Sequence, residues 1–199
     1  MISILLLAAG QSSRMGTRDK LLELIDGQPL LARVTSRALS VAPTYVTLPA
    51  LNHPRAAVLS SHANVVAVPD AMKGMAASLC RGIAALPKQT TGVIIMPADM
   101  PDITNKDLGA ILAHSKSTPN PIVRATTNDG KPGHPTYFSR AMFPKLKALK
   151  GDTGAAPICA AHLDETMFVP LQGNRARLDL DTPEDWHAYR SRGEGLGAS

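Results

Sequence analysis

The stretch that decides the fold lies at the start of the chain, where residues 2–20 read ISILLLAAGQSSRMGTRDK. Its first half is a short apolar run that stops at Gly10, as interior strands of parallel sheets often do. Its second half is a loop of small residues, which can turn several backbone N–H groups toward one anion. Arg14 and Lys20 add two positive side chains at the same place. The stretch therefore predicts a buried strand that leads into a site for a nucleoside triphosphate.

The loop lacks the spacing of the two best-known phosphate-binding motifs. No second glycine followed by Lys and Ser or Thr occurs, as a Walker loop requires, and the Rossmann G-x-G-x-x-G is missing. A strand followed by an ordinary basic surface loop is the simpler alternative, but such loops seldom combine small, glycine and basic positions in this way. A different nucleotide-binding family is therefore indicated.

Residues 7–20 match a known pattern. The run Leu-Ala-Ala-Gly-x-Ser-x-Arg-Met-Gly, followed by a lysine four residues later, resembles the signature of nucleotidyltransferases with a GT-A-like fold. Within that fold it resembles the MobA-like NTP transferase family, in the branch of molybdenum cofactor cytidylyltransferases and their guanylyl relatives. The resemblance implies that Arg14 and Lys20 act in catalysis. It also implies that the nucleotide contacts Leu7, Ala8, Ala9, Gly10, Ser12, Arg14, Gly16 and Lys20.

Length and composition fit one globular domain. A chain of 199 residues can bury a sizeable core, and 44% hydrophobic with 19% charged residues is an ordinary balance. We expect a nucleotidyltransferase domain over residues 1–190 and a flexible, glycine-rich tail over 191–199. No apolar run approaches the roughly 20 residues of a membrane span. The first apolar segment has no basic residues before it, so we expect no signal peptide, no membrane association and a cytoplasmic location.

The formal net charge of +5 suits anionic partners. Nucleic acid is the first alternative, but the basic residues are scattered and aromatic residues are only 4%, so we expect no nucleic-acid binding. A phosphorylated small molecule explains the same excess of positive charge. Cys80 and Cys159 are far apart in the chain and predict neither a zinc site nor a disulfide framework; we expect both in the core.

The order of the predicted elements indicates an α/β fold. Apolar runs predict strands over residues 44–48, 64–68, 91–97, 122–125 and 166–170. Helical spacing and helix-start residues predict helices over 29–39, 54–62, 74–83, 104–115 and 138–149 and a last helix from Thr182. This alternation predicts right-handed parallel crossovers. Together with the resemblance, it implies a single-domain, three-layer αβα sandwich with a mostly parallel sheet, Rossmann-like and of the GT-A type.

Residues 74–83 predict a helix whose small residues permit close approach of a backbone or a ligand. A helix that merely packs tightly on the sheet is the alternative. The segment resembles a family element beside the bound nucleotide, which implies that Gly74 and Ser78 contact it. Upstream, residues 69–73 lack the Asn and the aromatic residue of close relatives, which puts the details of base recognition in doubt.

Asp99 follows the apolar run of residues 91–97, so it lies at the carboxyl end of a predicted strand, where α/β sheets bind their ligands. A lone Asp in this position is often a helix cap or a turn residue. The sequence Asp99-Met100-Pro101 resembles the magnesium-binding element of the family. The resemblance implies that Asp99 binds Mg²⁺, contacts the nucleotide and acts in catalysis.

Two further segments resemble the family's acceptor side. Residues 133–138, Gly-His-Pro-Thr-Tyr-Phe, border the pocket for the accepting substrate in relatives, which implies acceptor contacts for Gly133 and His134. A structural turn histidine is an equal alternative for His134. The run Gly151-Asp152-Thr153-Gly154 combines a flexible turn with a helix start, and the resemblance assigns Gly151 and Asp152 to the acceptor as well. By itself, Asp152 is a candidate helix cap rather than a base.

Asp181 belongs to an acidic cluster that precedes a predicted helix. Thr182 and Pro183 are typical helix-start residues, so capping explains part of this cluster. The resemblance implies that Asp181 is a second carboxylate near the metal. Both readings stay open at this point.

The resemblance implies a reaction as well as a fold. A nucleotidyl group passes from a nucleoside triphosphate to a phosphorylated acceptor, with Mg²⁺ as cofactor and pyrophosphate as leaving group. Ala9 stands where guanylyl relatives have a second glycine, so we expect CTP as nucleotide and a molybdopterin-type substrate as acceptor. A xanthine-dehydrogenase-like apoenzyme or its maturation factor is the implied recipient.

Two alternatives remain from the sequence. One is a nucleotidyltransferase that acts on a sugar phosphate or another phosphorylated acceptor. The other is a non-catalytic protein of cofactor maturation that keeps the fold only for binding. The joint presence of Arg14, Lys20 and Asp99 argues against the second alternative.

Overall fold

Seven strands form the central sheet of the computed structural model, which describes residues 1–194. Their order across the sheet is β5-β4-β1-β6-β8-β7-β9. A separate two-stranded hairpin pairs β2 with β3. The strands are β1 (Ile2–Leu7), β2 (Leu24–Ile25), β3 (Gln28–Pro29), β4 (Thr44–Leu48), β5 (Asn64–Ala67), β6 (Gly92–Pro97), β7 (Ile122–Thr126), β8 (Pro132–Ser139) and β9 (Thr166–Pro170).

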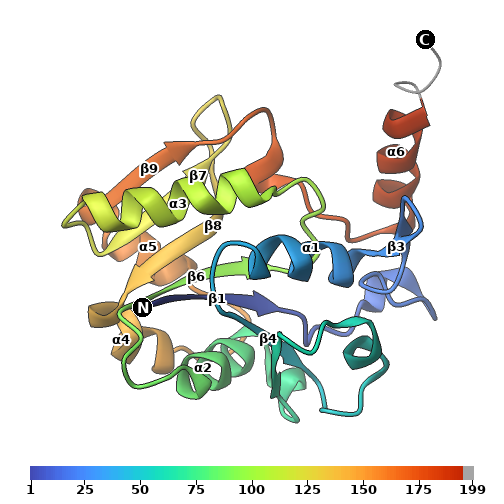
Figure 1. The fold of residues 1–199 in the computed structure, drawn as a ribbon, viewed down its shortest axis with the longest axis horizontal. Helices are drawn as coiled ribbons and strands as arrows, with labels where there is room; N and C mark the ends of the chain where they lie inside the picture. Colours follow the sequence, from blue (N-terminus) through green and yellow to red (C-terminus); the bar gives the residue numbers. More distant parts are fainter. Residues whose placement is uncertain (195–199) are drawn as a thin grey trace.

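Helices cover both faces of this sheet (Figure 1). Side chains of β1 alternate between the faces: Ile4 and Leu6 join one buried cluster, and Leu5 joins another. The first cluster includes apolar residues of α1, α3 and α6, and the second includes those of α2, α4 and α5. The predicted three-layer sandwich is therefore confirmed. The helices are α1 (Leu30–Leu39), α2 (Met75–Ala85), α3 (Asn105–Ser117), α4 (Phe143–Lys147), α5 (Ala156–Ala161) and α6 (Pro183–Glu194).

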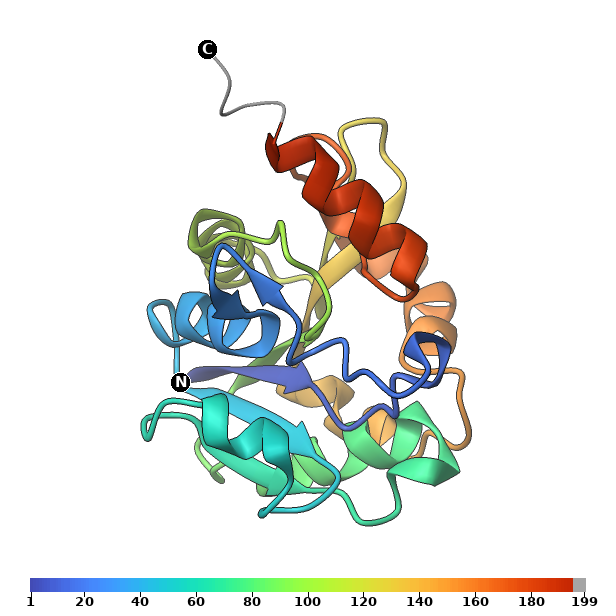
Figure 2. The same cartoon turned by 90° about the vertical axis from the view of Figure 1, so that its right-hand side faces the viewer.

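The sheet is mostly parallel, as predicted, with β8 as its antiparallel strand. Strand β1 pairs in parallel with β4 and with β6. Because parallel strands end at the same edge, the loops that follow β1, β4, β5 and β6 meet there. Figure 2 shows the loop after β1 between α6 and the segment near the start of α2. The candidate site lies at this edge.

Two predicted helices are wrong in length. Residues 54–62 form only a 3-10 helix, Pro54–Val58, because residues 60–62 are Ser, Ser and His and offer no apolar side chain to continue a buried helical face. Residues 138–149 were expected to be one helix, but Phe138 is a fully buried strand residue that pairs with Val93 and Ile122. Tertiary pairing overrides local helical spacing there, and α4 is confined to Phe143–Lys147.

The last helix reaches beyond the predicted domain end at residue 190. α6 continues to Glu194, and its Trp186 is buried in the core with 1% exposure. Residues 195–199 of the predicted tail lie outside the described residues. Cys159 is buried, as predicted, whereas Cys80 is only partly buried. None of the helices within residues 1–194 is long and apolar enough to cross a membrane.

Candidate active site

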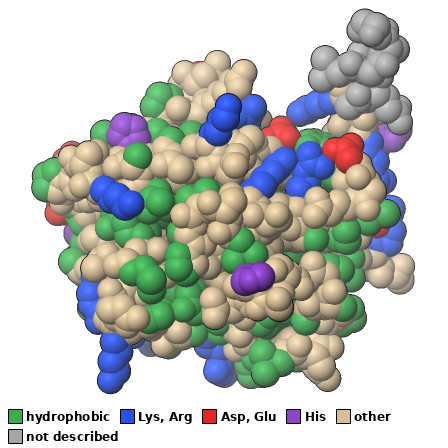
Figure 3. All heavy atoms as spheres, viewed as in Figure 1, with side chains coloured by type: hydrophobic (Ala, Val, Ile, Leu, Met, Phe, Trp, Pro, Cys, Tyr) green, Lys and Arg blue, Asp and Glu red, His purple; other side chains and the backbone are tan. Residues whose placement is uncertain are grey.

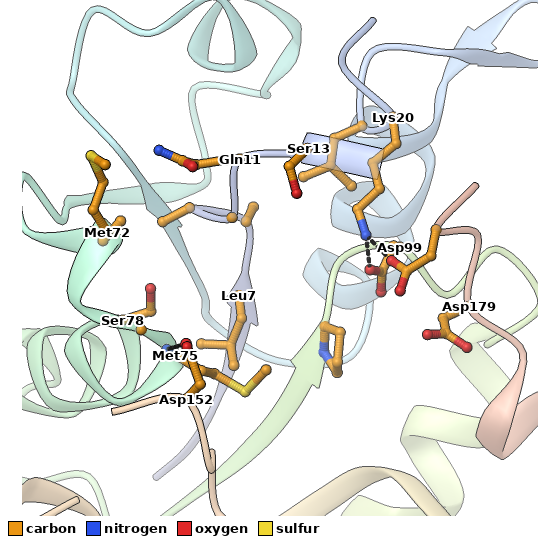
Figure 4. A pocket seen from close by; sticks show the side chains of 18 residues that line it. Leu7, Gln11, Ser13, Lys20, Met72, Met75, Ser78, Asp99, Asp152 and Asp179 are labelled. Atoms are coloured by element: carbon orange, nitrogen blue, oxygen red, sulfur yellow. Dashed lines mark hydrogen bonds and ion pairs between the residues drawn. The ribbon is translucent and has the colours of Figure 1, made fainter. Parts of the chain in front are cut away.

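A cavity of about 530 Å³ opens at the carboxyl edge of the sheet. The loop after β1 forms one wall. The start of α2 and the segment that precedes α6 form two others (Figure 4). We call it the loop cavity. It is lined by Leu7, Ala8, Ala9, Gly10, Gln11, Ser13, Lys20, Leu21, Ala71, Met72, Gly74, Met75, Ser78, Pro97, Asp99, Asp152, Asp179 and Asp181.

The loop after β1 has a bent conformation. Met15 is buried in the core and anchors the 3-10 turn Ser13–Met15. Ser12 has a left-handed backbone conformation with φ of 54°, which turns the chain over the cavity. Within the described part of the chain, no protein acceptor lies within hydrogen-bonding distance of the backbone N–H groups of residues 9–12. Unpaired N–H groups in such a bend can bind an anion.

Charged side chains from three distant segments meet beside this loop. Lys20 Nζ lies 2.5 Å from Asp99 Oδ2 and 2.5 Å from Asp181 Oδ1. Arg14 Nη1 lies 2.7 Å from Asp181 Oδ2. Figure 4 shows the lysine reaching down to the carboxylates. The structure thus brings together the four charged residues that the sequence singled out for the nucleotide and metal.

The carboxylates and the lysine influence one another. Burial alone lowers the pKa of Lys20, but attraction by Asp99 and the hydrogen bond to Asp181 outweigh it, so the pKa is raised. Lys20 is therefore fully charged. The pKa of Asp179 is raised by burial and by the like charges of Asp99 and Asp181. Asp179 is a further acidic side chain of the site, and the sequence did not single it out because it belongs to no recognised motif.

Asp99 has an oxygen that could bind a divalent cation. Asp99 Oδ1 is buried and has no hydrogen-bond partner among residues 1–194, while its other oxygen contacts Lys20. A buried carboxylate oxygen without a partner is costly unless something binds it. Asp179 is close enough to Asp99 and to Asp181 to interact with both electrostatically. Within residues 1–194, no group of three or more acidic, His or Cys side chains is arranged to hold a metal ion by itself. Mg²⁺ prefers oxygen ligands and is commonly held by one or two carboxylates plus phosphates, so the unpartnered oxygen of Asp99 fits such an ion as one ligand.

The start of α2 is closed by another segment. Met75 N donates to Asp152 Oδ1 at 3.2 Å, and Ala76 N donates to the Gly151 carbonyl at 3.0 Å. Gly74 has φ of 105°, and a side chain there would collide with Gly151 and Asp152. Asp152 was predicted to cap the helix that follows it. This prediction is wrong: α5 begins only at Ala156, and Asp152 instead caps α2.

A second, smaller cavity of about 200 Å³ adjoins the first, and we call it the His134 cavity. Leu7, Met75 and Asp152 line both cavities. His134 Nδ1 is buried there and has no hydrogen-bond partner among the described residues. Burial, assisted by the positive charge of Arg124, lowers the pKa of His134 to about 4, so its imidazole is neutral. The remaining lining residues are Leu79, Ile95, Thr136, Phe138, Thr153, Gly154, Ala155, Ala156 and Cys159.

Some predicted site residues lie elsewhere. Gly133 and Gly151 do not line either cavity in the part of the chain that the structure describes. A side chain at Gly133 would collide with the carbonyl oxygen of Ala176, so close backbone packing explains this glycine. Ser12 turns its hydroxyl toward Asp19, and Gly16 lies on the outer side of the loop.

Several residues of the loop cavity were missed. Gln11 and Ser13 line it and lie in the very loop that was recognised, at positions where the pattern accepts any residue. Met72 lies in the segment that departs from the family pattern and is 82% exposed at the rim of the cavity. No local sequence signal marks these three side chains.

Comparison with known proteins shows the family of the chain. The model of the MobA-like NTP transferase domain matches residues 4–166. The purine catabolism protein PucB of Bacillus subtilis (strain 168) is 27% identical over 204 residues, which cover 92% of this chain and 93% of PucB. A molybdenum cofactor guanylyltransferase of Vibrio cholerae serotype O1 is 31% identical over 158 residues, covering 75% of this chain and 72% of that protein.

A solved structure shares the whole architecture. The crystal structure of Rv0371c from Mycobacterium tuberculosis H37Rv superimposes with a TM-score of 0.82 at 27% identity, covering 96% of this chain and 97% of Rv0371c. A manganese complex of the same protein gives a TM-score of 0.78 at 26% identity, covering 94% and 96%. Fold, cavity and relatives together define a nucleotidyltransferase. The chain belongs to the MobA-like NTP transferase family.

Proposed function

We propose that the protein transfers a cytidylyl group from CTP to the phosphate of molybdopterin or the molybdenum cofactor and releases pyrophosphate. The Vibrio cholerae relative is named for guanylyl transfer to the molybdenum cofactor, which supports this acceptor. CTP rather than GTP rests on Ala9, which replaces the second glycine of the guanylyl branch. Ala9 is 2% exposed and lines the loop cavity, and its methyl group is proposed to narrow the space for a larger base.

One observation carries the proposal: unpaired loop amides and Lys20 line one cavity together with carboxylates, and Arg14 is paired with one of these carboxylates, Asp181. The amides of residues 9–12 and the side chains of Lys20 and Arg14 are donors for a triphosphate. Both cations are paired with Asp181 in this structure, and Lys20 also with Asp99. Bound phosphates compete for the same donors, so we expect Lys20 to exchange carboxylate contacts for phosphate contacts.

The chemistry needs no protein nucleophile. An oxygen of the acceptor phosphate attacks the α-phosphorus, the new P–O bond forms, and the bond from the α-phosphorus to the bridging oxygen breaks. The electron pair leaves with pyrophosphate. The protein therefore works by alignment and by charge compensation. Lys20, Arg14 and the loop amides stabilise the negative charge on the leaving phosphates.

Mg²⁺ is the proposed cofactor, with Asp99 and Asp181 as its ligands and Asp179 beside them. When bound, the ion neutralises phosphate charge and orients the triphosphate. The orphaned Asp99 Oδ1 supports this assignment. The manganese complex of Rv0371c shows that a similar protein takes up a divalent cation.

The His134 cavity is the proposed acceptor side. A neutral imidazole with an unpaired buried Nδ1 can exchange one hydrogen bond with a polar group of the acceptor. Arg124 supplies a positive charge in the same cavity. Asp152 lines both cavities, which supports a position for it between the two proposed substrates. The recipient of the product is proposed to be a xanthine-dehydrogenase-like apoenzyme or its maturation factor; the name of PucB as a purine catabolism protein supports this choice.

The acceptor is tested by pyrophosphate release. The purified protein is incubated with CTP and Mg²⁺ and with molybdenum cofactor, a panel of sugar phosphates, or no acceptor. We expect release that depends on the molybdenum cofactor. Release with sugar phosphates alone would support the sugar-phosphate alternative. Binding of nucleotide without release for any acceptor would support a non-catalytic maturation protein.

A further inference from the structure

Arg55 is the most completely bonded buried charge beside the site. It lies in the 3-10 turn after β4 and is only 2% exposed. Its Nε and Nη2 hold the two carboxylate oxygens of Asp19 at 2.7 and 2.8 Å. Its Nη1 donates to the carbonyls of Ala8 at 2.6 Å and Gly10 at 2.7 Å, and Nη2 also reaches Ser12 Oγ at 3.1 Å. These contacts employ all five N–H donors that a guanidinium has.

The guanidinium lies on the outer side of the loop. Arg55 lines a separate hollow that also includes Asp19, and it does not line the loop cavity. Ala9, Gly10 and Gln11 line both spaces, so this part of the loop is a thin wall between them. Arg55 therefore contacts the wall from behind.

The hydrogen bonds from Arg55 to two loop carbonyls determine which way the neighbouring backbone N–H groups point. In a planar trans peptide, the C=O group and the N–H group of the next residue point in opposite directions. The carbonyls of Ala8 and Gly10 point toward Arg55. The N–H groups of Ala9 and Gln11 consequently point away from Arg55, toward the loop cavity.

We propose that Arg55, locked by Asp19, is a positioning residue that presets the loop amides for the triphosphate. It acts through the loop and not by contact with substrate, and this inference rests on the proposed function of the loop cavity. A preset loop binds phosphates without first being ordered, which favours affinity. The specific geometry matters more than the charge, because a lysine keeps the charge but cannot hold two carbonyls and a carboxylate at once.

The test measures binding of inorganic tripolyphosphate by calorimetry, which depends on neither base nor acceptor. We expect Arg55→Lys to raise the dissociation constant at least tenfold, and Asp19→Asn to raise it severalfold because the guanidinium loses its charged partner. Millimolar guanidinium should restore part of the affinity of Arg55→Ala. Thermal melting of each variant, with binding measured well below the melting temperature, separates loop geometry from loss of fold.

Arg140→Lys is the matched control. Arg140 also donates to a backbone carbonyl, that of Thr90 at 2.7 Å, but it does so before β6, at the opposite edge of the sheet. We expect a lower melting temperature and a tripolyphosphate dissociation constant within twofold of the unmodified protein. Unchanged affinity in a folded Arg55→Lys, or in Asp19→Asn if the lysine variant does not fold, would overturn the inference. If the unmodified protein bound neither tripolyphosphate nor CTP, the proposed function would fail and this inference with it.

Discussion

The two cavities meet at Leu7, Met75 and Asp152 but are built in opposite ways. The loop cavity relies on charge: Lys20, carboxylates and unpaired amides lie at its wall. The His134 cavity is small and largely apolar, and it keeps its histidine neutral by burial. A triphosphate is recognised mainly by its negative charge, whereas a pterin-like group is recognised by its shape and by a few hydrogen bonds. With the proposed substrates in these cavities, we expect that affinity for nucleotide and selection of acceptor can be changed separately.

Loss of one carboxylate should have the largest effect. We expect Asp99→Asn to lower turnover roughly a thousandfold, because electrostatic groups at a reacting phosphate are worth about this much. Its side-chain volume is unchanged, so the fold should persist. Asp102→Asn is the control, because Asp102 lies in the same loop as Asp99 but accepts a hydrogen bond from the Tyr189 hydroxyl. This variant should leave turnover unchanged. Near-normal activity of Asp99→Asn at moderate Mg²⁺ would remove Asp99 from the metal role.

The neutral His134 predicts a pH dependence of stability. Its folded pKa of about 4 lies below the unfolded value of 6.5, so the unfolded chain binds more protons between these values. The free energy of unfolding should therefore fall as the pH falls from 6.5 to 4, by about 3 kcal/mol in total. Urea denaturation at a series of pH values between 4 and 6.5 measures this free energy of unfolding. His134→Gln should flatten this part of the profile; an identical slope in the variant would contradict the burial of a neutral imidazole.

Binding of CTP in the loop cavity should depend on Lys20. We expect Lys20→Ala to lower kcat/KM for CTP roughly a hundredfold and to leave the KM for the acceptor within twofold. Lys116→Ala removes the same charge from the exposed end of α3 and should change neither parameter. If the only measurable effect of Lys20→Ala were a lower melting temperature, Lys20 would be a structural residue and the contrast between the cavities would lose its main support.

A change in the His134 cavity should affect the acceptor and not the nucleotide. His134→Gln should raise the acceptor KM about tenfold, the equivalent of one hydrogen bond of roughly 1.4 kcal/mol, and leave the KM for CTP unchanged. Steady-state kinetics with each substrate varied in turn separates the two. An equal rise in both KM values would show that the cavities are coupled and do not act as separate sites.

The same contrast explains what the sequence could reveal. The strand, the loop and Asp99 are predictable because each is a continuous motif, and the elements around them follow from apolar periodicity. Arg55 and Asp179 belong to no motif, and their roles depend on segments that meet only in the folded chain. Asp152 was assigned to the wrong helix for the same reason. A cap is recognised from local sequence, yet its partner here is Met75, in an earlier part of the chain.

Choice of base is the smallest predicted effect and the most direct test of cytidylyl transfer. The measurement is kcat/KM for CTP and for GTP, with Mg²⁺ and the molybdenum cofactor as acceptor. One methyl group in a pocket is worth only about 1–3 kcal/mol, so we predict a preference for CTP of at least about tenfold and a partial loss of it in Ala9→Gly. Comparable efficiency with CTP and GTP in the unmodified protein would contradict the cytidylyl assignment and leave the nucleotidyltransferase in place.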